Sequence, residues 1–105
     1  MNIKSILENG TLTVYIVGEI AHHSAGGWRE AIDREIVCAQ PTALVMDFSD
    51  VSFMDSSGVG LVMGRYKCMH AREGTLRLRG LSPRLEKMMT LAGLDRLPVW
   101  ETKGV

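Results

Sequence analysis

The sequence is organised around one stretch, VSFMDSSGVGLVMGRYK at residues 51–67. It begins with apolar residues, turns at Asp55-Ser56-Ser57-Gly58, and continues with apolar residues at helical spacing. Aspartate and serine are favoured N-cap residues, because a short side-chain oxygen can accept from the free N–H groups of a first helical turn. The stretch therefore predicts a loop that delivers hydroxyl groups to a helix N-terminus, where an anion would also be stabilised.

The chain is short and electrically balanced. Its 105 residues suit a single domain, 1–105, and its hydrophobic content of 46% is that of a globular protein. Lys and Arg together number 12, as do Asp and Glu, so the net charge is zero. This balance argues against direct binding of nucleic acid and against a polybasic membrane anchor. No apolar run approaches the ~20 residues that span a bilayer, and the N-terminus lacks the apolar core of a signal peptide.

The two cysteines, Cys38 and Cys68, have no CxxC spacing and fall on predicted helices. They are typical of reduced thiols in a cytoplasmic protein. A zinc site would need both of them with two of His22, His23 and His70, and the spacing gives no support for one. We expect no metal ion and no cofactor.

Periodicity and turn residues predict an alternation of strands and helices. Asn9-Gly10 is a two-residue hairpin turn, and Ser82-Pro83 is a helix start. The predicted strands lie at 2–7, 11–17, 42–48, 75–80 and 97–100. The predicted helices run from 23 or 24 to about 39, from 57 to 72, and from 82–83 to a glycine cap at 93. The order β-β-α-β-α-β-α-β predicts an α/β layer fold.

The predicted helix 57–72 has two unlike faces. Its expected core face consists of Val59, Val62, Met63, Tyr66 and Met69. The other side consists of Gly60, Gly64, Cys68 and Ala71 together with Leu61, flanked by Arg65 and Arg72. Glycines are unfavourable within a helix, so close approach by another backbone would explain them. That backbone could be a strand of the same fold or a protein partner. Gly74 is expected to end the helix in a left-handed conformation.

The sequence does not support an enzyme active site. The pattern Gly58-x-Gly60-x-x-x-Gly64 resembles a dinucleotide loop, but the chain has too few strands and the next one ends with Arg79 rather than an acidic residue. Gly64 is followed by arginine, not by the lysine of a P-loop, and neither serine has the Gly-x-Ser-x-Gly context of a nucleophile elbow. His22 or His23 could act as a base, yet no complete catalytic set is present.

A modification switch fits the central stretch better. A phosphate on Ser56 would add about two negative charges at a helix N-terminus. The helix dipole would accommodate these charges while the neighbouring Asp55 would repel them, so the effect on the fold would be small. A partner docked over the loop would be strongly disfavoured, because it would bury an uncompensated dianion.

Three segments resemble the STAS-domain anti-sigma factor antagonists, and most closely the sporulation members of that family. They are Phe53-Met54-Asp55-Ser56-Ser57-Gly58-Val59-Gly60 with Gly64-Arg65-Tyr66-Lys67, then Gly18-Glu19-Ile20-Ala21-His22-His23-Ser24, and the final helix with Gly93-Leu94. The resemblance spans nearly the whole chain. It implies a STAS fold, in which a mixed sheet of four to five strands is flanked by helices.

The resemblance also implies a function in partner switching that controls transcription. Such a protein binds an anti-sigma factor that is a serine kinase, and thereby releases a sigma factor. The kinase, which itself holds ATP or ADP, phosphorylates the first serine of the motif, here Ser56, and a serine phosphatase reverses this. The family pattern implies that Asp55, Ser57 and Gly58 shape the site and that His22, His23 and Arg65 lie near it. With Ser56, and with Gly60, Leu61 and Gly64 from the glycine-lined side of the helix, these are the expected partner-binding residues.

The sequence departs from the family pattern at Ala21, where the family has an aspartate before the two histidines. The substitution bears on partner choice and on the phosphorylation rate. An alternative function is a STAS module that senses a ligand or acts as a scaffold and is never phosphorylated.

Overall fold

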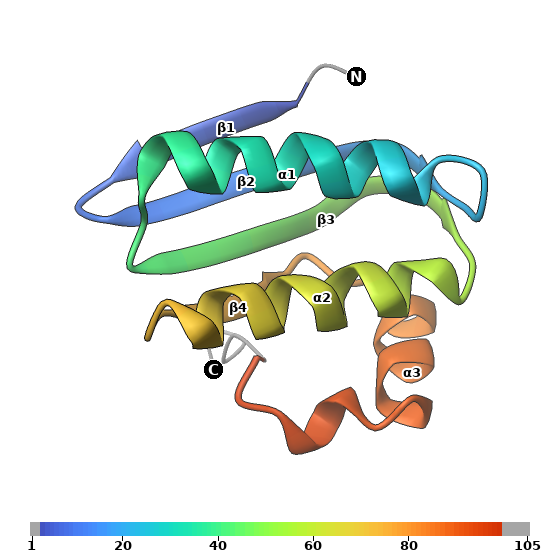
Figure 1. Ribbon diagram of the computed structural model, residues 1–105. Helices are drawn as coiled ribbons and strands as arrows, with labels where there is room; N and C mark the ends of the chain where they lie inside the picture. Colours follow the sequence, from blue (N-terminus) through green and yellow to red (C-terminus); the bar gives the residue numbers. More distant parts are fainter. Residues whose placement is uncertain (1–2, 100–105) are drawn as a thin grey trace.

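The computed structural model describes residues 3–99, in which strands and helices alternate along the chain (Figure 1). The strands are β1 (Lys4–Glu8), β2 (Thr11–Ile20), β3 (Ala43–Met54) and β4 (Thr75–Arg79). The helices are α1 (Ala25–Ala39), α2 (Ser57–Ala71) and α3 (Pro83–Leu91), followed by the 3₁₀ turn η1 (Leu94–Arg96). The predicted α/β fold is confirmed, and the mixed sheet, expected to have four to five strands, has four within the described residues.

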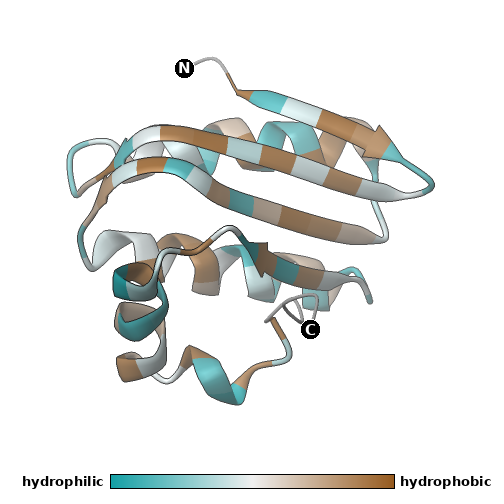
Figure 2. Cartoon of the chain, turned by 180° about the vertical axis from the view of Figure 1, so that it is seen from behind, coloured by the Kyte–Doolittle hydropathy of each residue, from teal (hydrophilic) through white to brown (hydrophobic). Residues whose placement is uncertain are grey.

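The four strands lie in the sheet in chain order, β1-β2-β3-β4. The hairpin pair β1–β2 is antiparallel, with Asn9 and Gly10 both at positive φ in the turn, whereas β2–β3 and β3–β4 are parallel. Two crossovers that step in the same direction along the sheet place their helices on the same face. Figures 1 and 2 show α1 and α2 together on one face, with the strands in front of them when seen from behind.

The core fills the space between this face and the two helices. The inward residues of β2, β3 and β4 alternate along each strand, and Leu12, Leu44 and Leu76 pair across the sheet in one row. Helix α1 contributes Trp28, Ile32 and Ile36, which recur every four residues and are buried. The Trp28 indole N–H also donates to the Glu19 carbonyl at 2.9 Å, which fixes the start of α1 against the end of β2.

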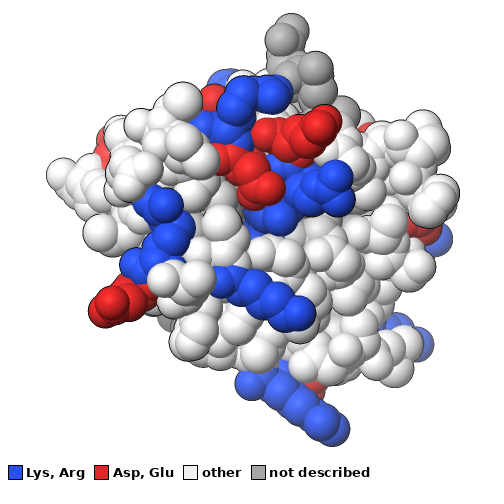
Figure 3. All heavy atoms as spheres, viewed as in Figure 1, with Lys and Arg blue, Asp and Glu red and all other residues white. Residues whose placement is uncertain are grey.

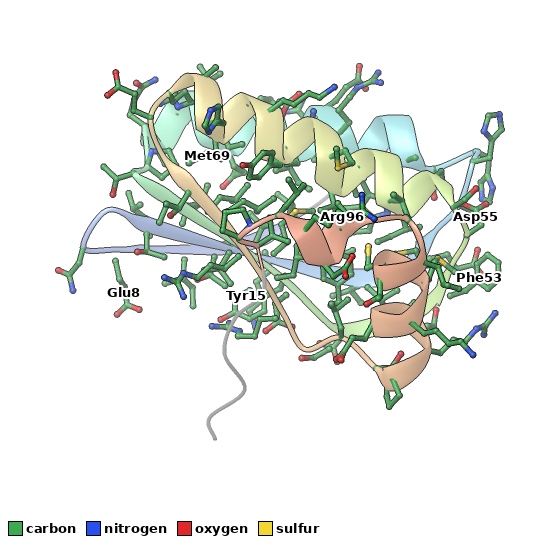
Figure 4. All side chains as sticks on the ribbon, turned by 90° about the horizontal axis from the view of Figure 1, so that it is seen from below. Glu8, Tyr15, Phe53, Asp55, Met69 and Arg96 are labelled. Atoms are coloured by element: carbon green, nitrogen blue, oxygen red, sulfur yellow. The ribbon has the colours of Figure 1, made fainter. Side chains whose placement is uncertain are left out.

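The opposite face of the sheet carries a polar row across the strands. Tyr15, Asp47 and Arg79 are register partners there, and Arg79 Nε donates to Asp47 Oδ2 at 2.9 Å. Figure 4 shows Tyr15 on the side of the sheet away from α1 and α2. Partial burial alone raises the pKa of Asp47, but hydrogen bonds from Ser49 and Arg79 outweigh it, so the pKa is lowered. A tyrosine and an ion pair therefore occupy the middle of this face.

Two strands are longer than predicted. Strand β2 continues through Gly18 to Ile20, and β3 continues from Phe48 to Met54. Register shifts between Tyr15 and Val17, and between Gly18 and Glu19, interrupt their pairing. Such bulges break the period-two alternation that identifies a strand in sequence, although the pairing resumes beyond them.

The prediction for the inward face of α2 was partly wrong. Leu61 and Arg65, which were placed on the glycine side, are buried, while Val59 and Tyr66 are only partly buried. The helix packs against α1 as well as against the sheet, so its buried stripe turns toward α1. Val62 and Met69 are buried as expected.

Two predictions near the end of the chain also need correction. Glu73, not Gly74, takes the left-handed conformation after α2, and a Cβ on Gly74 would lie 2.8 Å from the Thr42 carbonyl oxygen. The predicted strand at 97–100 is not formed by residues 97–99, and Trp100 lies outside the described residues. The Val99 carbonyl nevertheless accepts from Leu78 N–H at the edge of β4.

Candidate functional site

The turns that precede α1 and α2 meet at one end of the sheet. Strands β2 and β3 are parallel and end in register, with Ile20 opposite Met54. The Asp55 N–H donates to the Ile20 carbonyl at 3.1 Å, which continues this pairing by one residue. Figure 4 shows Asp55 at one end of the molecule and Glu8, next to the β1–β2 hairpin turn, at the other end. This end, formed by residues 21–24 and 55–58, is the candidate site.

The Asp55 carboxylate joins the two turns. Its Oδ1 accepts from the Ser57 N–H at 2.8 Å and also from the Ser57 hydroxyl, and its Oδ2 accepts from the His22 N–H at 3.0 Å. The Ser57 hydroxyl, the Ser57 N–H and then the His22 N–H lower the pKa of Asp55 by hydrogen bonding to its charged form. Asp55 therefore accepts from the first residue of α2 and holds the His22 backbone beside it.

The two serines of the motif lie in different environments. The Ser57 hydroxyl donates to Asp55 and is half-buried, whereas Ser56 is exposed and its hydroxyl has no hydrogen-bond partner among residues 3–99. Ser56 stands at the N-cap position of a 15-residue helix, where the dipole favours negative charge. The Ser56 hydroxyl is therefore accessible from solvent, whereas the Ser57 hydroxyl is held by its hydrogen bond to Asp55.

Gly58 fixes the position of this helix start. It is buried, and a Cβ there would lie 2.3 Å from the sulfur of Met54. The Met54 side chain at the end of β3 thus occupies the space that a side chain at position 58 would need. Ser56 lies in the short connection between these two residues.

The other predicted site residues divide into two groups. His22 and His23 are exposed on the turn before α1, within the candidate site. Gly60, Leu61, Gly64 and Arg65 instead line a groove between α1 and α2, which Ser57 also borders. Ala21 is buried, and its N–H donates to the Ser24 hydroxyl oxygen at 3.0 Å while its carbonyl accepts from the N–H groups of Ser24 and Ala25.

The groove adds residues that the sequence did not indicate. Ala25, Gly26 and Arg29 of α1 form its other wall. Asp33, also on α1, lies 3.0 Å from Arg65 on α2. A charge pair between helices that are distant in sequence has no local signature. The small residues Ala25-Gly26-Gly27 are a local signal that could have indicated a groove.

The described residues offer little that could hold a metal ion or act as a base. Within residues 3–99, no three His, Cys, Asp or Glu side chains are grouped as metal ligands would be. No histidine or carboxylate of that range hydrogen bonds to the Ser56 hydroxyl. None of the described helices is both long and apolar enough to cross a membrane. Ser56 is therefore an exposed hydroxyl without a hydrogen-bonded base among residues 3–99.

The whole chain is similar to known proteins. The STAS domain matches residues 2–104. An anti-sigma F factor antagonist of Lysinibacillus sphaericus is 36% identical over 84 residues, which cover 80% of this chain and 72% of the relative. An anti-sigma-B factor antagonist of Listeria monocytogenes is 35% identical over 98 residues, which cover 90% of this chain and 85% of the relative. The Bacillus cell fate determinant SpoIIAA, solved in its phosphorylated form, is 31% identical with a TM-score of 0.71, and the match covers 97% of this chain and 93% of that one.

Proposed function

This chain belongs to the STAS domain family, and we propose that it is an anti-sigma factor antagonist whose partner binding is ended by phosphorylation of Ser56. The partner is an anti-sigma factor with serine kinase activity, which carries the ATP or ADP. Binding releases a sigma factor in the cytoplasm, and a serine phosphatase restores the unmodified chain. Direct binding of nucleic acid or membrane forms no part of this function.

The observation that carries the proposal is the difference between Ser56 and Ser57. A kinase needs a hydroxyl that it can reach and orient, and Ser56 alone of the two is exposed and unbonded. The Ser57 hydroxyl donates a hydrogen bond to Asp55, and this bond would have to break before Ser57 could be phosphorylated. The site therefore favours phosphorylation of Ser56 before any specific contact with a kinase is considered.

The expected consequence is loss of binding with little change in fold. A phosphate on Ser56 adds about two charges beside the carboxylate of Asp55, and an opposing surface that packs on the loop would have to desolvate both. The N-terminus of α2 stabilises the same charges when they are exposed to water. The phosphorylated chain would therefore remain folded but would no longer fit its partner.

Phosphorylation by purified anti-sigma factors with ATP, followed by mass spectrometry, tests the proposal. Suitable kinases are the anti-sigma F factor of Lysinibacillus sphaericus and the anti-sigma-B factor of Listeria monocytogenes. We expect one phosphate on the wild type and on Ser57→Ala, and none on Ser56→Ala. A phosphate that persists on Ser56→Ala would contradict the assignment. Binding without any phosphate gain would instead indicate a scaffolding or ligand-sensing module.

A further inference from the structure

A groove lies between α1 and α2, next to the turn that carries Ser56. Its volume is about 440 Å³, and its walls are Ala25, Gly26 and Arg29 on one side and Ser57, Gly60, Leu61, Gly64 and Arg65 on the other. In Figure 3 charged side chains gather over α1, whereas the surface over the first turns of α2 is mostly uncharged. Arginine is the only charged residue type that lines the groove.

The helix glycines at the groove are not explained by packing within the described fold. A Cβ on Gly60 or on Gly64 would meet no atom within 4 Å, in contrast to Gly58 on the same helix. The first of the two explanations for these glycines, close approach by a strand of the same fold, is therefore wrong. Glycine is unfavourable in a helix interior compared with alanine. A surface that lies over these two positions in a complex would explain why they carry no side chain.

Arg65 forms a buried positive charge whose hydrogen bonds are incomplete. Its side chain is only 7% exposed, and its Nε lies 3.0 Å from Asp33 Oδ1 in an ion pair that lacks hydrogen-bond geometry. Its Nη1 is buried without a partner among residues 3–99. An unsatisfied buried donor is unfavourable, and more so on a charged group. The Asp33 side chain is 41% exposed, and its carboxylate approaches the guanidinium at Nε.

We propose that the groove receives an acidic side chain, Glu or Asp, from the anti-sigma factor that binds over Ser56; this rests on the proposed function. The carboxylate would accept from the guanidinium of Arg65, which lines the groove, with support from Arg29, while the partner backbone passes over Gly60 and Gly64. The guanidinium fork suits a carboxylate oxygen better than it suits a neutral acceptor. Ser57 borders both the groove and the Ser56 turn, so one partner surface can cover both.

Glycine substitutions separate this proposal from a purely structural role. Gly60→Ala and Gly64→Ala fill open space and improve helix propensity, so each should raise the Tm by roughly 4–8 °C. The same variants should bind the anti-sigma factor at least tenfold more weakly, because a methyl group lies where the partner passes. Lys67→Ala, an exposed change on α2 outside the groove, is the matched control and should keep wild-type affinity.

A double-mutant cycle tests the charge pairing. Arg29→Ala, which alters an exposed side chain, is combined with replacement of each acidic residue on the partner by its amide, and affinities are measured by calorimetry. We expect one partner carboxylate whose contribution to affinity depends on the presence of Arg29. Separately, Arg65→Lys should weaken binding by at least tenfold, because lysine lacks the guanidinium fork.

The probe for both experiments is the anti-sigma factor that phosphorylates the wild-type chain. Glycine variants that are more stable yet bind as tightly as the wild type would overturn the groove proposal, and so would the lack of any coupled carboxylate. Phosphorylation of Ser56 would continue in that case, so the proposed function would stand. A wild-type chain that binds no anti-sigma factor would overturn both.

Discussion

The turns before α1 and α2 lie side by side and each leads into a 15-residue helix with serine at the N-cap, but they are stabilised differently. The Ser24 hydroxyl is used within its own turn, where it accepts from Ala21 N–H and lies 3.3 Å from the Glu19 and Ala21 carbonyl oxygens. In the second turn a carboxylate, Asp55, makes the stabilising bonds. The comparison shows how a loop can be well ordered and still keep one hydroxyl, that of Ser56, free.

The largest expected effect comes from a charge placed on the free hydroxyl position. Ser56→Asp should weaken binding of the anti-sigma factor at least tenfold, about 1.4 kcal/mol, because the charge must be desolvated beside Asp55. Calorimetric titration measures the change. Thr75→Asp adds the same charge at the exposed start of β4 and should leave affinity unchanged. Equal losses for the two variants would show that net charge alone matters.

A substitution that moves the second turn should destabilise the fold. In Gly58→Ala the new methyl group clashes with Met54, whose flexible thioether can yield in part. We expect a loss of about 1 kcal/mol in the free energy of unfolding, measured by urea denaturation. The sign is opposite to that expected for Gly60→Ala on the same helix. A more stable Gly58→Ala would show that β3 and α2 are less closely packed than described.

Removal of the hydroxyl from the first turn should affect stability but not switching. Ser24→Ala loses the hydrogen bonds that close residues 21–24, at an expected cost of about 0.5–1 kcal/mol. Phosphorylation of Ser56 should proceed at the wild-type rate, as followed by mass spectrometry. A slower phosphorylation in Ser24→Ala would show that the two turns are coupled beyond their Asp55 contact.

The smallest effect should be a difference in acid sensitivity. The pKa of Asp55 is lowered in the folded chain, so its contribution to stability is present above the unfolded value of about 3.9. The contribution disappears as the pH falls through the lower folded value. The Tm difference between wild type and Asp55→Asn should therefore shrink between pH ~5 and pH ~2. Asp47 titrates in both proteins and does not affect this difference.

Local signals in the sequence predicted much of the fold. Asn9-Gly10 gave the hairpin because both residues tolerate positive φ, and Ser82-Pro83 gave the start of α3, where the Ser82 hydroxyl accepts from Leu85 N–H. The Asp55-Ser56-Ser57-Gly58 motif indicated the helix start at the site. These features depend on residues close together in the chain, and so their patterns can be read directly.

Features that depend on distant contacts were not predictable in the same way. The burial of Arg65 depends on Asp33 and on the packing of α2 against α1, which hydrophobic periodicity does not record. The choice of Ser56 over Ser57 came from the family motif, whereas its physical basis, the bond from Ser57 to Asp55, required coordinates. The end of β3 was missed because bulges interrupt its alternation.

The most direct test of the switch is the affinity of one preparation for its anti-sigma factor before phosphorylation, after it, and after phosphatase treatment. The wild type should bind, the form carrying phosphate on Ser56 should bind at least tenfold more weakly with an unchanged circular dichroism spectrum, and the phosphatase should restore the initial Kd. Equal affinity of the unmodified and phosphorylated forms would contradict the account.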